Sequence, residues 1–343
     1  MRPIQILLLG VGGNVSQGIL KAIKDTTLDY HVIGACISPD SEGLYMCQEA
    51  YLSPLAASEQ FIPWLFAICA GKHVDIVLSG VEEVIEAIAP HKEELLKKTG
   101  TVFRSSSPDR LGIGNDKLLT CRWLEEHGFR APDHCAADDR EAVRALWERH
   151  GYPLIAKPRR GKGSGGVSII REDEALEQTA DLRDYVIQEY IGDPSQEYTV
   201  GCYRAMNGYM PLPIVMRRTL QNGMSWKTEV VEALRIQETA MRICAAFQPD
   251  GPFNIQLRLD RDGTPVPFEF NVRFSGTTPI RSHFGFRDVE AMLYESILER
   301  DISSCFHIHG GVAYRYIEEL YLDGTPRFDE QGKLVDRCSK ATE

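Results

Sequence analysis

The stretch LLLGVGGNVSQG, residues 7–18, decides the start of the fold, because an apolar run ends abruptly in glycines. Residues 4–9 are typical of a strand covered on both faces, and residues 15–23 carry apolar side chains at helical spacing. Further strands are predicted over 31–37 and 74–78, the second followed by a long helix to about Lys98. These strand–helix units predict an open parallel sheet at the N-terminus.

The glycine turn allows two interpretations. Gly10 and Gly12 occupy the first two glycine positions of a dinucleotide-binding fingerprint. Val15 stands at the third position, however, and Asp40 lies beyond the tip of the second strand, displaced from where a ribose would need it. We therefore favour a turn that only joins strand and helix, and keep NAD binding as the alternative.

Composition excludes several classes of protein. A formal net charge of -11 over 343 residues argues against nucleic acid as a partner. Nine cysteines without a CxxC pair predict reduced thiols, with neither a disulfide framework nor a zinc site. Because no uninterrupted apolar stretch of roughly 18 residues occurs, we expect a cytoplasmic protein without a membrane partner.

The character of the chain changes after a polar segment, residues 104–110, which marks a domain boundary. A helix is predicted from about Asp116 to His127, with Asn115 as its cap. From residue 153 onward, short strands predict an antiparallel sheet with one inserted helix, about Thr228 to Phe247. The fold class is therefore α/β followed by α+β.

Two stretches suit a nucleotide. In PLIAKPRRGKGSGGVSII, residues 153–170, a strand presents Lys157 and leads into a glycine-rich basic loop, which can fold over a polyphosphate or be a flexible hairpin tip. In YVIQEYIGDPSQEYTV, residues 185–200, Gln188 and Glu189 are followed by Glu197. That spacing provides acceptors for an adenine and a carboxylate for a ribose, although an ordinary edge strand is the alternative.

A third stretch, residues 254–273, suits a metal ion. A hairpin across Asp262-Gly263 places Gln256 opposite Glu269, and Glu269, Asn271 and Arg273 alternate by two, so that they share one face. Such a face suits Mg²⁺ with phosphates, since Mg²⁺ takes few protein oxygens. The alternative is a solvated face, which is disfavoured because Phe268, Phe270 and Val272 are expected to pack on the opposite side.

The order and spacing of these motifs resemble those of the ATP-grasp superfamily, with one module of the carbamoyl-phosphate-synthetase type. The N-terminal glycine-loop region is similar to the pre-ATP-grasp domain, which keeps a Rossmann-like sheet without binding NAD. The resemblance implies a Rossmann-like pre-ATP-grasp domain over residues 1–106 and a two-part ATP-grasp fold. Its small subdomain, with the lid loop, would span 107–192, and its large subdomain, with the metal site, 193–343.

The resemblance also implies roles for individual residues, with ATP and Mg²⁺ as cofactors. Lys117 and Lys157 match the lysines on the ATP phosphates, and Arg273 matches the arginine that steadies the transferred phosphoryl group. Glu197 matches the acid on the ribose. The adenine hinge corresponds to Gln188, Glu189, Tyr190 and Ile191, the lid loop to Gly161, Gly163, Ser164, Gly165 and Gly166, and the metal positions to Gln256, Glu269 and Asn271. Because Gln256 replaces a carboxylate found in many members, a second Mg²⁺ is in doubt.

The implied activity is a carboxylate–amine ligase that forms an acyl phosphate from a small carboxylate, as in an amino acid. Substrate contacts are expected from residues that flank the metal motif and from a basic stretch upstream: Ser275, Gly276, Thr277, Arg281, Arg217 and Lys227. Surface charges are the alternative for each basic residue in this set. A non-catalytic ATP-binding module and an NAD-dependent oxidoreductase remain alternative functions, and a homodimer is left open.

Overall fold

The computed structural model describes residues 2–161, 165–173, 176 and 182–337. The chain divides into two compact units, and neither unit is one continuous segment. Unit 1 comprises residues 1–108, 273–307 and 316–343, and unit 2 comprises residues 109–272 and 308–315. The division into three domains made from the sequence stays a prediction.

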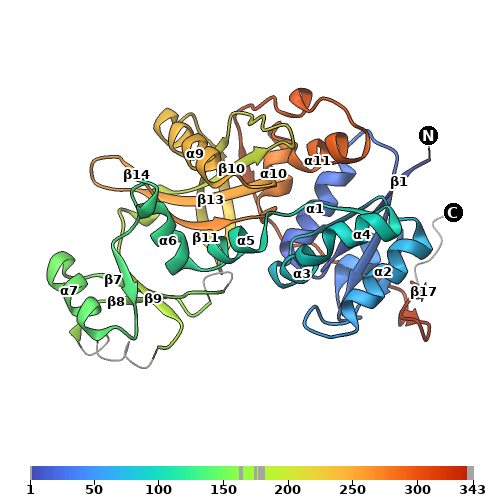
Figure 1. Cartoon of the computed structure of the whole chain (residues 1–343), viewed down its shortest axis with the longest axis horizontal. Coiled ribbons are helices and arrows are strands. Elements are labelled where there is room, and N and C mark those ends of the chain that lie inside the picture. The colour runs from blue at the N-terminus through green and yellow to red at the C-terminus, as the bar shows by residue number, and fades with distance from the viewer. Residues whose placement is uncertain (1, 162–164, 174–175, 177–181, 338–343) are drawn as a thin grey trace. The chain divides into compact units, whose positions relative to one another are not determined.

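Unit 1 is built on a five-stranded parallel sheet with strand order β3-β2-β1-β4-β5 (Figure 1). The predicted parallel sheet is thus confirmed, with two strands added to those expected. The strands are β1 Ile4–Leu9, β2 Tyr30–Cys36, β3 Glu49–Leu52, β4 Ile76–Ser79 and β5 Val102–Phe103. Its helices are α1 Asn14–Lys24, α2 Phe61–Lys72, α3 Glu82–Ile88, α4 Lys92–Thr99, α10 Thr278–His283 and α11 Asp288–Ile297, with a C-terminal hairpin of β16 Arg327–Phe328 and β17 Leu334–Asp336.

The long helix expected to reach Lys98 is wrong, because it is broken at Pro90. Helix α3 ends at Ile88, a short 3₁₀ turn covers Ala89–His91, and α4 begins at Lys92. Proline has no backbone N–H and its ring displaces the preceding carbonyl, so a helix cannot continue regularly through it.

Side chains of unit 1 pack closely against the glycines of the turn after β1. A Cβ on Gly10, whose φ is +71°, would lie 2.3 Å from Val81 Cγ2, and a Cβ on Gly12 would lie 2.6 Å from Ser41 Oγ. Further along α1, a Cβ on Gly18 would lie 2.9 Å from Pro279 of α10. Close packing therefore accounts for these glycines.

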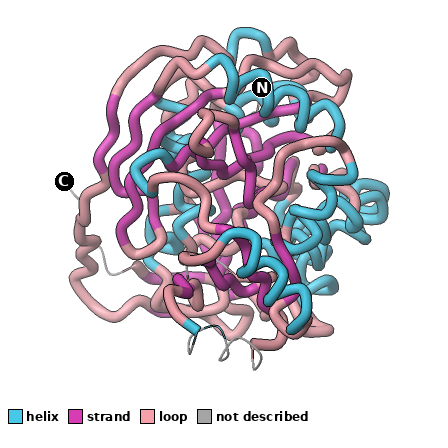
Figure 2. Tube along the Cα trace, turned by 90° about the vertical axis from the view of Figure 1, so that its left-hand side faces the viewer, coloured by secondary structure: helices cyan, strands magenta, loops and turns pink. Residues whose placement is uncertain are grey.

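Unit 2 contains two antiparallel sheets, whose strands Figure 2 shows in magenta. The four-stranded sheet has the order β6-β9-β7-β8 and the six-stranded sheet β14-β13-β10-β11-β12-β15. The strands are β6 His134–Ala136, β7 Leu154–Pro158, β8 Ser168–Ile170, β9 Tyr185–Glu189, β10 Glu197–Arg204, β11 Ile214–Gln221, β12 Met224–Val230, β13 Gly251–Leu259, β14 Pro265–Asn271 and β15 Val312–Tyr314. The helices are α5 Pro108–Gly114, α6 Lys117–Glu126, α7 Arg140–His150 and α9 Leu234–Phe247.

Two predicted helix starts in unit 2 are wrong. The helix expected from Thr228 begins at Leu234, because residues up to Val230 belong to β12. Strands β11 and β12 form a hairpin across Asn222-Gly223, whose φ angles are +51° and +73°. The other is α6, which begins at Lys117. Its cap is Asp116 and not Asn115, because the Asp116 carboxylate accepts from the backbone N–H groups of Leu118 and Leu119.

An aromatic cluster forms the core of unit 2 and joins α6 and α9 to the six-stranded sheet. The ring centroids of Trp123 on α6 and Phe270 on β14 lie 5.8 Å apart, with an interplanar angle of 68°. Phe253 lies 5.0 Å from Phe270 and stacks on Phe247 of α9 at 5.1 Å. These offset and edge-to-face contacts fix α6 relative to β13 and β14.

A buried ion pair forms part of the core of unit 1. Arg281 of α10 and Asp288 of α11 are both wholly buried and are hydrogen-bonded to each other. Arg281 also donates to Ser275 Oγ at 3.2 Å and to Thr278 Oγ1 at 3.1 Å. Burial raises the pKa of Asp288 although Arg281 opposes the shift, which shows that the pair is costly to hold.

We predict that Asp288→Ala lowers the free energy of unfolding by about 3–5 kcal/mol, because it leaves a buried guanidinium without its counter-charge. Arg327→Ala, which removes the ion pair between two more exposed side chains in the same unit, should cost less than about 1 kcal/mol. Urea denaturation of both variants measures the difference. Equal losses would show that the buried pair contributes no more than the exposed one.

Candidate active site

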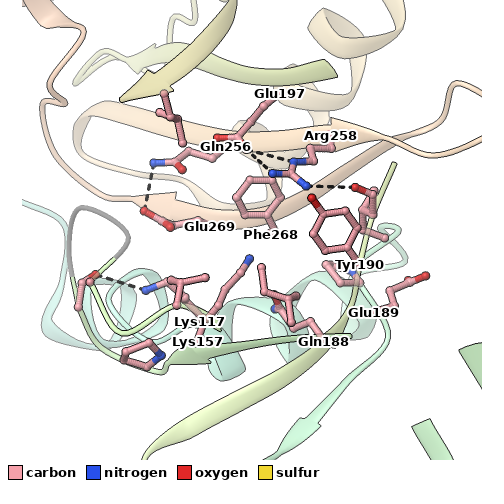
Figure 3. A pocket seen from close by; sticks show the side chains of 18 of the residues that line it. Lys117, Lys157, Gln188, Glu189, Tyr190, Glu197, Gln256, Arg258, Phe268 and Glu269 are labelled. Atoms are coloured by element: carbon pink, nitrogen blue, oxygen red, sulfur yellow. Dashed lines mark hydrogen bonds and ion pairs between the residues drawn. The ribbon is translucent and has the colours of Figure 1, made fainter. Parts of the chain in front are cut away.

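A pocket of about 790 Å³ of empty space, its open mouth included, lies within unit 2 (Figure 3). One wall carries Lys117, Lys157 and Gln188, and the other carries Gln256, Phe268 and Glu269. The remaining lining residues are Pro132, Ile155, Pro158, Gly161, Gly165, Val167, Glu189, Tyr190, Ile191, Glu197, Arg218, Leu220 and Arg258.

Lys117 is positioned by the start of α6. Asp116 caps the helix and also accepts two hydrogen bonds from Arg159, at 3.0 Å from Nε and 2.6 Å from Nη2. The backbone N–H of Lys117 donates to the carbonyl of Arg159, and its Nζ donates to the carbonyl of Gly161 at 3.3 Å. The Lys117 ammonium is therefore held beside the beginning of the glycine loop.

Lys157 faces the pocket because successive side chains of β7 point to opposite faces of the sheet. Leu154 and Ala156 point into the core of the small sheet, whereas Ile155 and Lys157 line the pocket. The Lys157 Nζ lies 4.4 Å from the centre of the Phe268 ring. Burial lowers the pKa of Lys157 to about 8, and the Glu269 carboxylate opposes this shift.

A β-bulge places both Phe268 and Glu269 in the pocket. Gln256 pairs with Glu269, as the hairpin predicted, but the next pair is Leu257 with Pro267, so Phe268 is an extra residue in β14. The expectation that Phe268 packs on the opposite side from Glu269 is therefore wrong. Bulges are common next to active sites because they redirect side chains.

A hydrogen-bonded network runs along the wall formed by the six-stranded sheet. Arg218 Nη2 donates to Glu197 Oε1 at 2.7 Å and to Gln256 Oε1 at 2.6 Å. Gln256 Nε2 donates to Glu269 Oε1 at 3.1 Å, and Asn271 Nδ2 donates to the same oxygen at 3.4 Å. The network links the expected ribose acid to the expected metal residues.

Glu197 lies between two arginines, Arg218 and Arg258, which the sequence pattern did not predict as its partners. Its Oε1 accepts from Arg218, and its Oε2 accepts from Arg258 Nη2 at 2.8 Å. Burial raises the pKa of Glu197, but the charges of Arg218 and Arg258 outweigh this effect and hold its pKa below the usual value. Arg258 also lies over the Tyr190 ring at 5.3 Å. A ribose hydroxyl would have to replace one of these arginine hydrogen bonds.

Gln188 brings a buried hydrogen-bond acceptor to the pocket. The residue is 1% exposed, and its Oε1 is buried without a hydrogen-bond partner among the described residues. Its Nε2 donates to Cys121 Sγ at 3.1 Å, which turns the oxygen away from the sulfur. The side chain of Glu189, by contrast, points away from the pocket, where its Oε1 accepts from Arg130 and from the Asp133 N–H (Figure 3).

The metal positions offer one carboxylate and two amides. No described residue donates to Oε2 of Glu269, so this oxygen is available to a cation. Within the described residues, no group of three or more His, Cys, Asp or Glu side chains could hold a metal by itself. The set fits Mg²⁺ that shares its coordination with phosphates, and it does not fit a closed protein site.

The other expected residues are distributed as follows. Asn271 is buried beside Glu269 and does not line the pocket. Gly166 is exposed and does not line it either. Arg217 and Lys227 line a second hollow of unit 2 together with Glu197 and Arg258. Gly163 and Ser164 lie outside the described residues. Arg273, Ser275, Gly276, Thr277 and Arg281 belong to unit 1.

Two of the expectations in unit 1 need correction. The complete burial of Arg281 beside Asp288 makes it an internal residue and not a surface clamp for substrate. Strand β14 ends at Asn271, so Arg273 does not continue the alternation of Glu269 and Asn271. It pairs with Glu82 instead.

The sequence contains a signal for a further part of the site that we did not predict. Asn222-Gly223 between two alternating segments is a strong hairpin signal, and it would have placed Arg218 on a strand beside Glu197. No local signal marks Arg258 as the partner of Glu197, because their contact depends on the pairing of β10 with β13.

Among the helices of the described residues, none combines the length and the apolar character that crossing a membrane requires.

Two segments of the chain match known protein families. Residues 114–277 match the ATP-grasp domain, and residues 6–103 match the N-terminal domain of PylC-like proteins. N5-carboxyaminoimidazole ribonucleotide synthetase from Thermus thermophilus superposes with a TM-score of 0.69 at 15% identity, covering 94% of this chain and 84% of that one. The predicted fold is therefore confirmed.

Two relatives align over part of their length. The carbamoyl phosphate synthase large chain of Sulfolobus acidocaldarius is 24% identical over 204 residues, which are 54% of this chain and 19% of that protein. The glutamate–LysW ligase ArgX of the same organism is 30% identical over 132 residues, which are 34% of this chain and 46% of that protein. The aligned region thus spans less than half of each relative.

We predict that the affinity for ATP falls as the pH rises through about 8, by up to roughly tenfold per unit above that value. The reason is that Lys157 loses its charge there, while bound phosphates favour the protonated form. Calorimetric titration between about pH 7.5 and pH 9.5 measures the effect, since the phosphates of ATP stay ionised in this range. Lys157→Arg, which keeps its charge, should flatten the profile, and an equal slope in both proteins would contradict the assignment.

Proposed function

Because residues 114–277 of this chain match the ATP-grasp domain, we propose that it is an ATP-dependent ligase that activates a carboxylate as an acyl phosphate and transfers the acyl group to an amine. The observation that carries this proposal is the opposition of charge across one pocket. Lys117 and Lys157 line one wall, and Gln256 and Glu269 line the other. Two lysines suit phosphates, and the facing carboxylate suits a cation that bridges them.

The part of the pocket beside Gln188 suits an adenine. Gln188 presents a buried acceptor that no described residue satisfies, and an exocyclic amine would supply the missing donor. Glu189, Tyr190 and Ile191, which follow Gln188 in the sequence, line the same pocket. Adenine has such an amine, whereas guanine presents a carbonyl at the corresponding position.

The phosphates would extend toward the glycine loop. Lys117 is tied to the carbonyl of Gly161, so that it stands where that loop begins, and Lys157 adds a second charge in drier surroundings. Glu269, with Asn271 and Gln256, would hold Mg²⁺, which supplies positive charge to the phosphate oxygens when it is bound. The loop would exclude water, which would otherwise hydrolyse an acyl phosphate.

The reaction needs charge neutralisation and no protein nucleophile. A carboxylate oxygen forms a bond to the γ-phosphorus of ATP, the bond from that phosphorus to the β,γ-bridging oxygen breaks, and ADP leaves. The amine then attacks the acyl carbon, the bond to the phosphate oxygen breaks, and phosphate and a proton are released. Lysines that are fixed before the reaction lower the cost of bringing two anions together.

The carboxylate substrate is proposed to be an amino acid. The glutamate ligase among the relatives supports this class, and it also raises the case in which the amine belongs to another polypeptide. A small amine and a polypeptide amine are distinguished by which of them stimulates ADP release. A non-catalytic ATP-binding module would bind ATP without such release.

We predict that Glu269→Gln and Lys157→Ala each lower kcat for ADP release by about 10²–10³-fold, because the first weakens the binding of Mg²⁺ and the second removes a positive charge that acts on the transferred phosphoryl group. The assay is coupled ADP detection over a panel of amino acids and amines, with mass spectrometry of the product. Arg144→Ala, which changes a side chain on α7 that is 77% exposed, is the matched control and should keep full activity. Unchanged turnover in both site variants would place the reaction elsewhere.

We also predict that Gln188→Leu weakens ATP binding by roughly 2–10-fold, the value of one hydrogen bond. The loss of affinity should come only from the missing hydrogen bond to the 6-amino group of adenine. Purine riboside triphosphate, which lacks that group, should therefore bind the wild type more weakly than ATP and bind both proteins alike. If the variant still prefers ATP to the same extent, Gln188 does not recognise the base.

A further inference from the structure

The side-chain amide of Gln256 has its oxygen and its nitrogen fixed by two different partners. Its Oε1 accepts from Arg218 Nη2 at 2.6 Å, and its Nε2 donates to Glu269 Oε1 at 3.1 Å. A guanidinium can only donate hydrogen bonds, and an ionised carboxylate can only accept them. An amide turned end for end would therefore oppose donor to donor and acceptor to acceptor, so the chemistry of the two partners sets its orientation.

Arg218 is itself held in place by a carboxylate of the same wall. Its Nε and Nη2 donate to Glu197 Oε1 at 3.1 Å and 2.7 Å, and its Nη1 donates to Ser225 Oγ at 3.4 Å. The side chains of Arg218 and Glu197 are only 10% and 6% exposed. Separating a buried ion pair is strongly unfavourable. The guanidinium is therefore a permanent neighbour of Gln256.

The orientation of the Gln256 amide makes it a poor ligand for a cation. Mg²⁺ is bound by oxygens, and the only oxygen of this side chain already accepts from Arg218. A cation on the same oxygen would lie beside the guanidinium charge, which repels it. Toward Glu269 the amide presents N–H groups instead. The carboxylate of Glu269, whose Oε2 accepts from no described residue, is the better ligand.

The charges that line the pocket match a nucleotide with a single cation. Glu189 points away from the pocket (Figure 3), and the other charged side chains of the described lining are Lys117, Lys157, Arg218, Arg258, Glu197 and Glu269. Four positive and two negative groups leave an excess of two positive charges. Fully ionised ATP with one Mg²⁺ carries two negative charges, so a second Mg²⁺ would bring positive charge that nothing in this lining balances.

We propose that this site binds one Mg²⁺, through Glu269, and that the guanidinium of Arg218 takes the place of a second ion in balancing the charge of the phosphates. Gln256 helps to hold the Mg²⁺ by positioning Glu269, while its own oxygen stays bound to Arg218. The inference rests on the proposed function for the identity of the nucleotide. Residues 218 and 256 together then determine how many metal ions the site takes.

The first test counts Mn²⁺, used in place of Mg²⁺, on the full chain saturated with the non-hydrolysable β,γ-imido analogue of ATP. The EPR signal of free Mn²⁺ measures how many ions are bound. The wild type should bind one ion per nucleotide and give no spin-coupled signal. Two bound ions in the wild type would overturn the inference.

The second test changes the residue at position 256. Gln256→Glu places a second carboxylate beside Glu269, so it should bind a second Mn²⁺ at least tenfold more tightly than the wild type does. The two ions should give a spin-coupled EPR signal, since the ions of two-metal sites are about 3.5–4 Å apart. A variant that binds no more Mn²⁺ than the wild type would contradict the role given to this position.

Arg258 provides a matched control for Arg218. Both arginines donate to Glu197, but only Arg218 donates to Gln256. Arg218→Leu should raise the affinity for a second Mn²⁺ several-fold, because it removes the repelling charge and frees the amide oxygen. Arg258→Leu should change that affinity less than twofold. Equal effects of the two variants would show that the contact with Gln256 does not control metal binding.

The metal count and the ligase function can fail separately. A wild type that binds the analogue with one Mn²⁺ but releases no ADP from ATP with any carboxylate and amine would disprove the ligase function and support the metal count. A wild type that releases ADP and binds two Mn²⁺ would do the reverse. If the analogue does not bind at all, both are disproved.

Discussion

The site depends on the aromatic cluster that joins α6 to the six-stranded sheet. Trp123 packs edge-on against Phe270, and Phe270 immediately follows Glu269 on β14. The same helix begins at Lys117 and contributes Cys121, which contacts Gln188. A single packed core thus sets the distances between Lys117, the Gln188 amide and the Glu269 carboxylate, which belong to segments far apart in the sequence.

Two charged residues of the site lie in buried surroundings that disfavour their charged forms. Lys157 has a lowered pKa, and Glu197 keeps its charge only because two arginines surround it. Burial makes the charged form of Lys157 less stable than it would be in water, and an anionic ligand would offset this cost. The network from Glu197 through Arg218 and Gln256 to Glu269 also makes these residues interdependent, and their substitutions should not be additive.

Sequence predicted the parts of the fold that depend on local pattern. The apolar run before Gly10, the alternation around Lys157 and the turn at Asp262-Gly263 all act over a few residues, and the structure has the expected strands there. The bulge at Phe268 was missed because it arises from pairing with β13. The pairing of Arg273 with Glu82 was missed because the two residues are distant in sequence. The burial of Arg281 was missed although its partner Asp288 is close in sequence, because both side chains are polar and no local pattern marks them as internal.

Unit 1 is assembled from stretches that the ribosome makes at very different times. All five parallel strands are synthesised early, but α10 and α11, which pack against α1, follow only after the whole of the segment 109–272. The C-terminal hairpin comes later still, and there Gly332 accepts from the Leu52 N–H while Lys333 pairs with Glu49. In a nascent chain, α1 therefore lacks these packing partners until residues 278–297 have been synthesised. An excised fragment that matches only the family boundary at residue 103 would remain in that incomplete state.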